Sequence, residues 1–271
     1  MTTAIRTAPA YPDQAQRPAF RLTQLAQALA ALVFGVAPIL AAGAYASFLG
    51  FSGHDQLVYR LGGAATFGYV VPPLVAIMWR SGWRDIRIPA VATLTFTVGA
   101  LLASAWELVA GAREPVVPFV AVAATGFTAV ALYWIRRDEG TETPVGRPLT
   151  TPARGIVALA TLSAATFGLL PLLSPSIFST AFNLAGTDAW VFRLAGAGCL
   201  GYATAGIASL AAPGYGRVRL QNLSAITFNF LGAVSAWYAV ANGDGGLLAP
   251  IVAAAATFFT VALAWIDRTL A

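Results

Sequence analysis

The sequence contains no lysine, only one histidine (His54) and only one cysteine (Cys199). Without lysine, the chain cannot form a retinal or pyridoxal Schiff base and has no P-loop lysine. A single histidine and a single cysteine exclude a disulfide framework, a tetrahedral zinc site and bis-histidine haem ligation. His54 lies in a polar loop, where a histidine can sense pH or ligate a metal or a pigment. Because it has no partner histidine, we expect it to be an ordinary loop residue.

Charged residues are also scarce. They make up 10% of the chain, against ~25% in an average soluble domain, whereas apolar residues make up 58%. This balance excludes a disordered chain, a nucleic-acid-binding domain and an ordinary soluble enzyme. It predicts a polytopic membrane protein.

Long apolar stretches recur along the whole chain. A bilayer core of ~30 Å requires ~20 mostly apolar residues in a helix. Eight stretches meet this requirement and are separated by short turns, so we expect an all-α integral membrane protein with eight transmembrane helices. They cover Leu25–Leu49, Leu57–Trp79, Ile88–Ala110, Val116–Ile135, Gly155–Ile177, Ala189–Ala212, Leu223–Ala241 and Leu248–Ile266.

The arginines indicate how these spans are oriented. Thirteen of the sixteen lie in the N-terminal tail, after the even-numbered spans or at the C-terminus, whereas the opposite loops hold only Arg113. The positive-inside rule therefore predicts that both termini are cytoplasmic, although arginine clusters can also bind anionic lipid headgroups. The arginine-rich, lysine-free composition is typical of a GC-rich coding sequence and favours a bacterial inner membrane.

The chain matches itself when it is shifted by 133 residues. The ordered matches indicate a tandem duplication of a four-helix unit. Four spans are an even number, so the pattern predicts two halves related by a pseudo-two-fold axis along the membrane normal. We expect a polar tail over residues 1–20, repeats over 21–137 and 154–271, and a cytoplasmic linker over 138–153. The shift places Phe34, Gly35 and Pro38 on Phe167, Gly168 and Pro171, Asp55–Ala64 on Asp188–Ala197, and Gly68-Tyr69 on Gly201-Tyr202.

Five charged residues are candidates for a site at the outer side of the membrane. Asp55 and Asp188 each occupy the expected N-cap of a span, and Arg60 and Arg193 follow within two turns. The two arginines could form an outward-open anion site near helix N-termini. The alternative is structural: each arginine pairs with a nearby aspartate or with Glu107, an acidic residue inside the third span, or reaches the lipid headgroups.

Other residues are candidates for close helix packing or for helix distortion. Small residues in the second and sixth spans form patterns that let helix backbones approach closely, or that border a substrate path. Prolines inside the first and fifth spans predict kinks. The small residues are Gly63, Ala64, Gly68, Gly196, Ala197 and Gly201, and the prolines are Pro38 and Pro171.

Few uncharged polar residues lie deep in the spans. Thr95 and Thr97 belong to the third span, and Thr227 and Asn229 to the seventh. Hydrogen bonding between helices is the expected role of such residues. The alternative is that they line a polar cavity.

No arrangement of nucleophile, base and metal ligand is visible, so we do not expect an enzyme. Two functions from different classes remain. The chain is either an accessory or scaffold subunit that holds lipid, pigment or a neighbouring membrane protein, or a transporter or channel for a small solute or anion with Arg60 and Arg193 at its outer mouth. We favour the first, with membrane lipids and other membrane subunits as partners and no identifiable cofactor beyond bound lipid.

Overall fold

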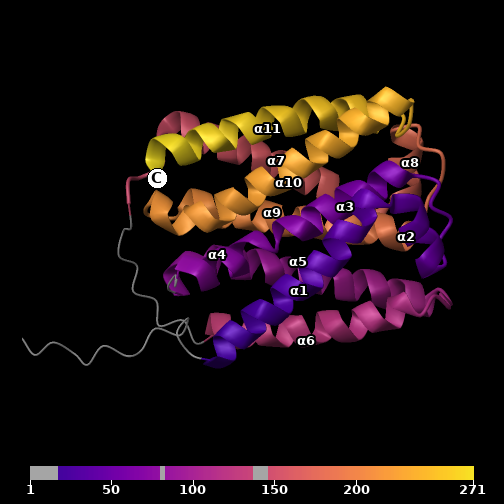
Figure 1. Cartoon of the computed structure of the whole chain (residues 1–271), viewed down its shortest axis with the longest axis horizontal. Helices are drawn as coiled ribbons and strands as arrows, with labels where there is room; N and C mark the ends of the chain where they lie inside the picture. Colours follow the sequence, from indigo (N-terminus) through magenta and orange to yellow (C-terminus); the bar gives the residue numbers. More distant parts are fainter. Residues whose placement is uncertain (1–17, 80–82, 137–145) are drawn as a thin grey trace, which may run out of the picture.

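The structure is a computed structural model that describes residues 18–79, 83–136 and 146–271, and these residues form α-helices and no β-strand (Figure 1). Most of the tail predicted over residues 1–20 lies outside them, as does the first half of the linker predicted over 138–153. The predicted end of the linker is wrong, because α7 begins at Thr151. The helices are α1 (Pro18–Leu40), α2 (Ala42–Leu49), α3 (Gln56–Gly68), α4 (Val71–Trp79), α5 (Trp83–Val109), α6 (Val116–Arg136), α7 (Thr151–Leu173), α8 (Pro175–Ala181), α9 (Ala189–Ala211), α10 (Tyr215–Asn242) and α11 (Leu248–Leu270).

Within these residues, eight helical stretches are long and apolar enough to cross a membrane, which confirms the predicted number of spans. They are α1, the α3–α4 pair, α5, α6, α7, α9, α10 and α11. This is the architecture of a polytopic α-helical membrane protein.

Three predicted spans are each divided between two helices. The span over 57–79 consists of α3 and α4, with a break at Tyr69 and Val70, and two others each consist of a long and a short helix. The stretch predicted as one span over 25–49 consists of α1 and α2, with a break at Ala41, and the stretch over 155–177 consists of α7 and α8, with a break at Ser174. Each long helix ends two residues after its internal proline, Pro38 or Pro171. A proline has no N–H for the helix ladder, and its ring crowds the preceding turn, which weakens the helix at this point.

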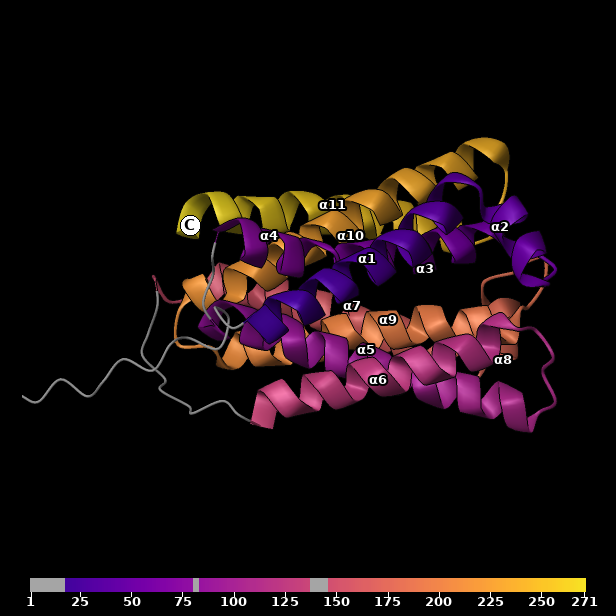
Figure 2. The same cartoon turned by 60° about the horizontal axis from the view of Figure 1, so that its bottom comes forward.

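The helices form two layers, which are separated most clearly in Figure 2. One layer contains α1, α3 and α4 together with α10 and α11. The other contains α5 and α6 together with α7 and α9. Residues 18–136 and residues 146–271, called here the first and second halves, therefore each contribute spans to both layers. Helices α3, α5, α9 and α10 meet at the centre.

The described chain starts and ends at the same end of the bundle, on the left of Figure 1. We call this the terminus end, and the end that carries α2 and α8 the far end. An even number of spans requires this arrangement. The side of the membrane on which the terminus end lies stays a prediction.

Candidate functional site

Two tyrosines meet at the centre of the bundle. The ring centroids of Tyr69 and Tyr202 are 5.0 Å apart. The Tyr69 hydroxyl donates a hydrogen bond of 2.9 Å to the carbonyl of Gly198, and the Tyr202 hydroxyl donates one of 3.1 Å to the carbonyl of Ala65. Each tyrosine thus binds a backbone carbonyl four residues before the other tyrosine, and the contact joins α3 to α9.

Gly68 and Gly201 make room for these hydroxyls. A Cβ atom on Gly68 would collide with the Tyr202 hydroxyl, and a Cβ on Gly201 would collide with the Tyr69 hydroxyl. The sequence marked these glycines as close-packing positions but did not assign a role to the tyrosines. The signal was present, because the pair Gly68-Tyr69 recurs as Gly201-Tyr202 in the self-match.

The other small residues lie where the first and second spans of each half cross. A Cβ on Gly63 would lie 2.7 Å from the carbonyl oxygen of Gly35, and a Cβ on Gly196 would lie 2.6 Å from that of Gly168. Ala64 and Ala197 are fully buried, and Ala197 packs on Gly99 of α5. These residues let α1 approach α3, and α7 approach α9, at backbone distance.

Asp55 and Asp188 join the two loops at the far end. The Asp55 Oδ2 atom accepts a hydrogen bond of 2.9 Å from the backbone N–H of Gly186, and the Asp188 Oδ2 atom accepts one of 3.0 Å from that of Gly53. Both aspartates occupy N-cap positions, but neither side chain bonds to its own helix. The expected capping role is therefore wrong, because each carboxylate bonds to the loop of the other half instead.

The environments of these two carboxylates differ. Burial raises the pKa of Asp55, and the backbone hydrogen bond from Gly186 offsets only part of this effect. Burial acts in the same direction on Asp188, but hydrogen bonds from the Tyr59 hydroxyl and from Ser52 outweigh it, so the Asp188 pKa is lowered. The charged form of the Asp188 carboxylate is therefore more strongly stabilised than that of Asp55.

The two arginines face different helices. Arg193 forms an ion pair with Glu107 and lies 4.9 Å from the centre of the Trp106 ring, both on α5. Arg60 lies 4.6 Å from the centre of the Tyr238 ring on α10, and its Nη2 atom donates a hydrogen bond of 3.0 Å to Gln56. Among the described residues, no carboxylate pairs with Arg60, and its buried Nη1 atom has no hydrogen-bond acceptor.

The intramembrane polar residues divide into two groups. Thr95 accepts a hydrogen bond of 2.9 Å from Thr204, and Thr97 accepts one of 2.9 Å from Thr128, so both link helices. Thr227 and Asn229 bond within α10, to the carbonyls of Leu223 and Ala225. Bonding between helices is therefore confirmed for Thr95 and Thr97 and wrong for Thr227 and Asn229. Thr97 and Asn229 also line cavities.

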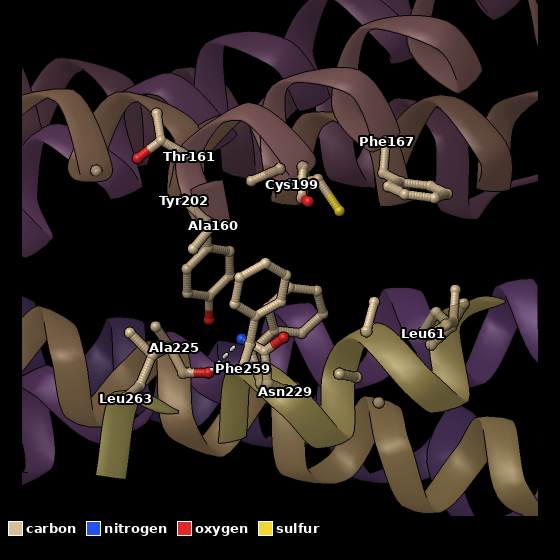
Figure 3. A pocket seen from close by; sticks show the side chains of 18 of the residues that line it. Leu61, Ala160, Thr161, Phe167, Cys199, Tyr202, Ala225, Asn229, Phe259 and Leu263 are labelled. Carbon is tan, nitrogen blue, oxygen red and sulfur yellow. Dashed lines mark hydrogen bonds between the residues drawn. The ribbon is translucent and has the colours of Figure 1, made fainter. Parts of the chain in front are cut away.

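Each half of the chain encloses a cavity beside the tyrosine contact. The first-half cavity, about 170 Å³, lies between α1, α3, α5 and α6, with α9 closing one side. The second-half cavity, about 160 Å³, lies between α7, α9, α10 and α11, with α3 closing one side. Figure 3 shows the second-half cavity between Phe167 and Cys199 on one wall and Asn229 and Phe259 on the other.

Many lining positions of the two cavities correspond. Among the described residues, no charged side chain lines either cavity. Most lining residues are alanine, phenylalanine and branched aliphatic residues, so both spaces suit an apolar guest. Lining pairs 133 residues apart are Phe34 and Phe167, Pro38 and Pro171, Val58 and Val191, and Tyr69 and Tyr202, and pairs 132 apart are Phe96 and Phe228, and Phe127 and Phe259.

His54 lies in the loop between α2 and α3, against the backbone of Gly186. Within the described part of the chain, no cluster of three or more histidine, cysteine, aspartate or glutamate residues is arranged to hold a metal ion.

Comparison of the chain with protein-family models, with curated proteins and with solved structures found no match.

Proposed function

We propose that the chain is a tandem duplication of a four-span unit whose two copies are related by a pseudo-two-fold axis along the membrane normal, which passes between Tyr69 and Tyr202. Reciprocal contacts support this proposal. The residues of the bond from Tyr69 to Gly198 and those of the bond from Tyr202 to Ala65 are related by the same offset of 133. That offset also relates the two loop-to-aspartate bonds at the far end.

The two halves, in our proposal, form a non-catalytic membrane protein that holds the apolar chain of a lipid in each cavity and acts as an accessory or scaffold subunit of a larger membrane assembly. The observation that carries this proposal is the pair of uncharged, matching cavities on either side of a closed centre. A chain that needed only to be stable would fill such spaces with side chains, because protein interiors are close-packed.

The size and position of the cavities suit part of a lipid chain. An apolar cavity of about 150 Å³ holds a guest the size of benzene, so each cavity accommodates about six carbon atoms. Phe119 lines the first-half cavity and is 58% exposed on the lateral surface of the bundle. It marks a side entrance between α1 and α6, through which the remainder of a lipid chain can extend into the bilayer.

Transport through the centre receives less support from the geometry. The tyrosine contact and the hydroxyls packed against Gly68 and Gly201 occupy the space between α3 and α9 at the centre of the bundle. Arg193, one of the two arginines proposed for an outer mouth, is neutralised by Glu107. These contacts favour a holding function over a conducting one.

For localisation, we propose the inner membrane of a bacterium with the terminus end in the cytoplasm. The support is the arginine distribution of the sequence. The apolar lateral surface, which includes exposed residues such as Leu22, Val33 and Val261, suits contact with membrane lipids and with neighbouring subunits.

The proposal is tested by native mass spectrometry of the protein purified in a gentle detergent. We expect two apolar lipids per chain. Ala123 and Ala255 line the two cavities at positions 132 residues apart. The Ala123→Leu and Ala255→Leu variants should each retain one lipid, because the added side chain occupies one cavity, and the double variant should retain none.

Two substitutions on the outer faces of the same helices are the matched controls. Ala129 of α6 and Ala254 of α11 are exposed and line neither cavity. The Ala129→Leu and Ala254→Leu variants should keep both lipids. If wild type carries no lipid, or if the cavity variants retain as much as the controls, the holding function is refuted. A protein that co-purifies in constant ratio identifies the partner subunit.

A further inference from the structure

The two cavities differ in polarity near the terminus end. In the first-half cavity, the Gln27 Nε2 atom donates a hydrogen bond of 2.9 Å to Thr93, so these two lining side chains are linked to each other. The equivalent lining positions in the second half are Ala160 and Ala225. The second-half cavity therefore lacks this internal polar link.

Gln221 lines the second-half cavity instead. It is only 5% exposed and makes no hydrogen bond to any described residue. Buried polar groups are nearly always bonded. The Gln221 amide atoms are not among the fully enclosed polar atoms of the described residues that lack a partner, so the amide borders open space. The Gln221 amide thus presents two N–H donors and one carbonyl acceptor to whatever enters this cavity.

The neighbouring polar groups are already engaged. The Ser209 hydroxyl donates to the carbonyl of Ala205, and the Asn222 amide donates to the Tyr215 hydroxyl and to the backbone. Figure 3 shows the Asn229 amide turned toward the carbonyl of Ala225, to which it donates a hydrogen bond of 2.8 Å. Among the lining residues that carry an amide or a hydroxyl, Gln221 and Ser163 are those for which the structure shows no hydrogen bond, and Gln221 is the more deeply buried of the two.

The position of Gln221 suits the head of an amphiphile. It lies six residues into α10, ~9 Å along the helix from Tyr215 at the terminus end. The lining toward the far end is apolar and includes Leu61, Phe178 and Leu248. A molecule with its polar head at Gln221 and its chain directed toward Phe178 thus matches both ends of the cavity.

We propose that the second-half cavity selects an uncharged amphiphile whose hydroxyl or carbonyl head hydrogen-bonds to Gln221. The ligand is uncharged because no charged side chain lines the cavity, and an unpaired charge is strongly disfavoured in such surroundings. This inference rests on the proposed lipid-holding function and names the ligand class of one of its two sites.

Photolabelling of the full chain in detergent micelles tests the inference. The probes are hexadecanol carrying a mid-chain diazirine, the corresponding diazirine hexadecane, which has no head, and the corresponding diazirine palmitate, which has a charged head. Labelled peptides are assigned to the two cavities by mass spectrometry. We expect hexadecanol to label the second-half cavity with about fivefold higher apparent affinity than hexadecane or palmitate, as one added hydrogen bond allows.

Gln221→Leu is the decisive variant, and Gln24→Leu is its matched control. Gln24 is also buried and lacks a hydrogen bond to the described residues, but it lines neither cavity. The Gln221→Leu variant should label with hexadecanol no better than with hexadecane in the second half, and first-half labelling should be unchanged. The Gln24→Leu variant should behave as wild type.

The outcomes separate this inference from the function on which it rests. Labelling of both cavities with no preference for hexadecanol, or a preference that survives Gln221→Leu, overturns the assigned head site and leaves the holding function standing. Preferred labelling by palmitate overturns the uncharged class. Labelling of neither cavity by any probe refutes the holding function itself. Thermal unfolding of each variant, measured in parallel, verifies that it is folded.

Discussion

Tyr69 and Tyr202 lie with their ring centroids 5.0 Å apart, and the hydroxyl of each donates to a backbone carbonyl of the opposite half of the chain. The two rings pack against each other at the centre of the bundle. The contact holds α3 and α9 together and leaves the cavities on either side of it. Each hydroxyl also occupies the space next to a glycine of the other half. Adding a methyl group to either glycine should therefore destabilise this centre.

The first prediction is the effect of adding a methyl group at Gly68 or at Gly201. Gly68→Ala should lower the free energy of unfolding by about 1–3 kcal/mol, because the new Cβ collides with the Tyr202 hydroxyl. Adding Tyr202→Phe should recover part of the loss, since the hydroxyl is removed. Gly201→Ala should not be rescued by Tyr69→Phe, because its Cβ also lies 2.6 Å from the backbone carbonyl of Ala92. Thermal unfolding in detergent measures all four variants, and equal rescue at the two positions would contradict the geometry.

A second prediction compares the two arginines. Arg193→Met should destabilise the protein by about 1–3 kcal/mol, because it leaves Glu107 without its partner in a largely buried site. Arg60→Met should change stability by less than about 1 kcal/mol, since the contact with Tyr238 is lost but a buried unpaired N–H is removed. Chemical or thermal unfolding distinguishes them. A larger loss at Arg60 would indicate that it has a bound partner of its own.

The aspartates at the far end provide a third prediction. Asp188→Asn should lower the free energy of unfolding by about 2 kcal/mol, because the carboxylate accepts bonds from Ser52, Gly53 and Tyr59, and an amide cannot accept all of them. Asp55→Asn should be nearly neutral at pH 7, because its oxygen can still accept the bond from Gly186 and the buried charge is removed. Equal effects of the two substitutions would be inconsistent with the opposite pKa shifts.

The same shifts predict how stability depends on pH. The Asp188 pKa is lowered, so its stabilisation is present above the ordinary value of 3.8 and is lost as the pH falls through the depressed pKa. The Asp55 pKa is raised, so its favourable contribution is complete below 3.8 and is lost as the pH rises through the raised value. The Asp188→Asn variant should therefore lose less stability than wild type as the pH falls below ~4. The Asp55→Asn variant should lose less stability than wild type as the pH rises from acid toward neutral. Unfolding curves at a series of pH values measure both.

Membrane topology provides the fourth prediction. A fluorescent protein that matures only in the cytoplasm should be active when fused after Ala271, and alkaline phosphatase, which is active only after export, should be inactive there. Phosphatase inserted in the α10–α11 loop, for example after Asp244, should be active because that loop is at the far end. The reverse pattern would refute the orientation inferred from the arginines.

Hydropathy alone was sufficient to predict the number of spans, because the length of each apolar stretch is dictated by bilayer thickness. Their interruptions were harder to predict. Pro38 and Pro171 predicted kinks in the first and fifth spans, but hydropathy did not show that α1 and α7 would each end two residues after the proline. The aspartates illustrate the same limit, because the local N-cap pattern at Asp55 and Asp188 could not reveal a stronger partner in the opposite loop.

The cavities could not be predicted from the sequence at all. A cavity depends on which side chains from distant helices fail to meet, and no local pattern encodes that. Asn229 and Thr97 were recognised as polar residues deep in the spans, but Gln221 was missed because it precedes the predicted start of its span at Leu223. The structure begins α10 at Tyr215, which places Gln221 inside the bundle.

Whether each cavity holds a lipid chain is tested by a cryo-electron microscopy map of the protein in lipid nanodiscs, with a bound antibody fragment to add mass. We expect elongated lipid density in both cavities, extending outward between α1 and α6 and between α7 and α11, with the head of the second-half ligand at Gln221. We also expect a dry contact between Tyr69 and Tyr202. Cavities closed by side chains, or a continuous water-filled path between α3 and α9, would refute the lipid-holding function.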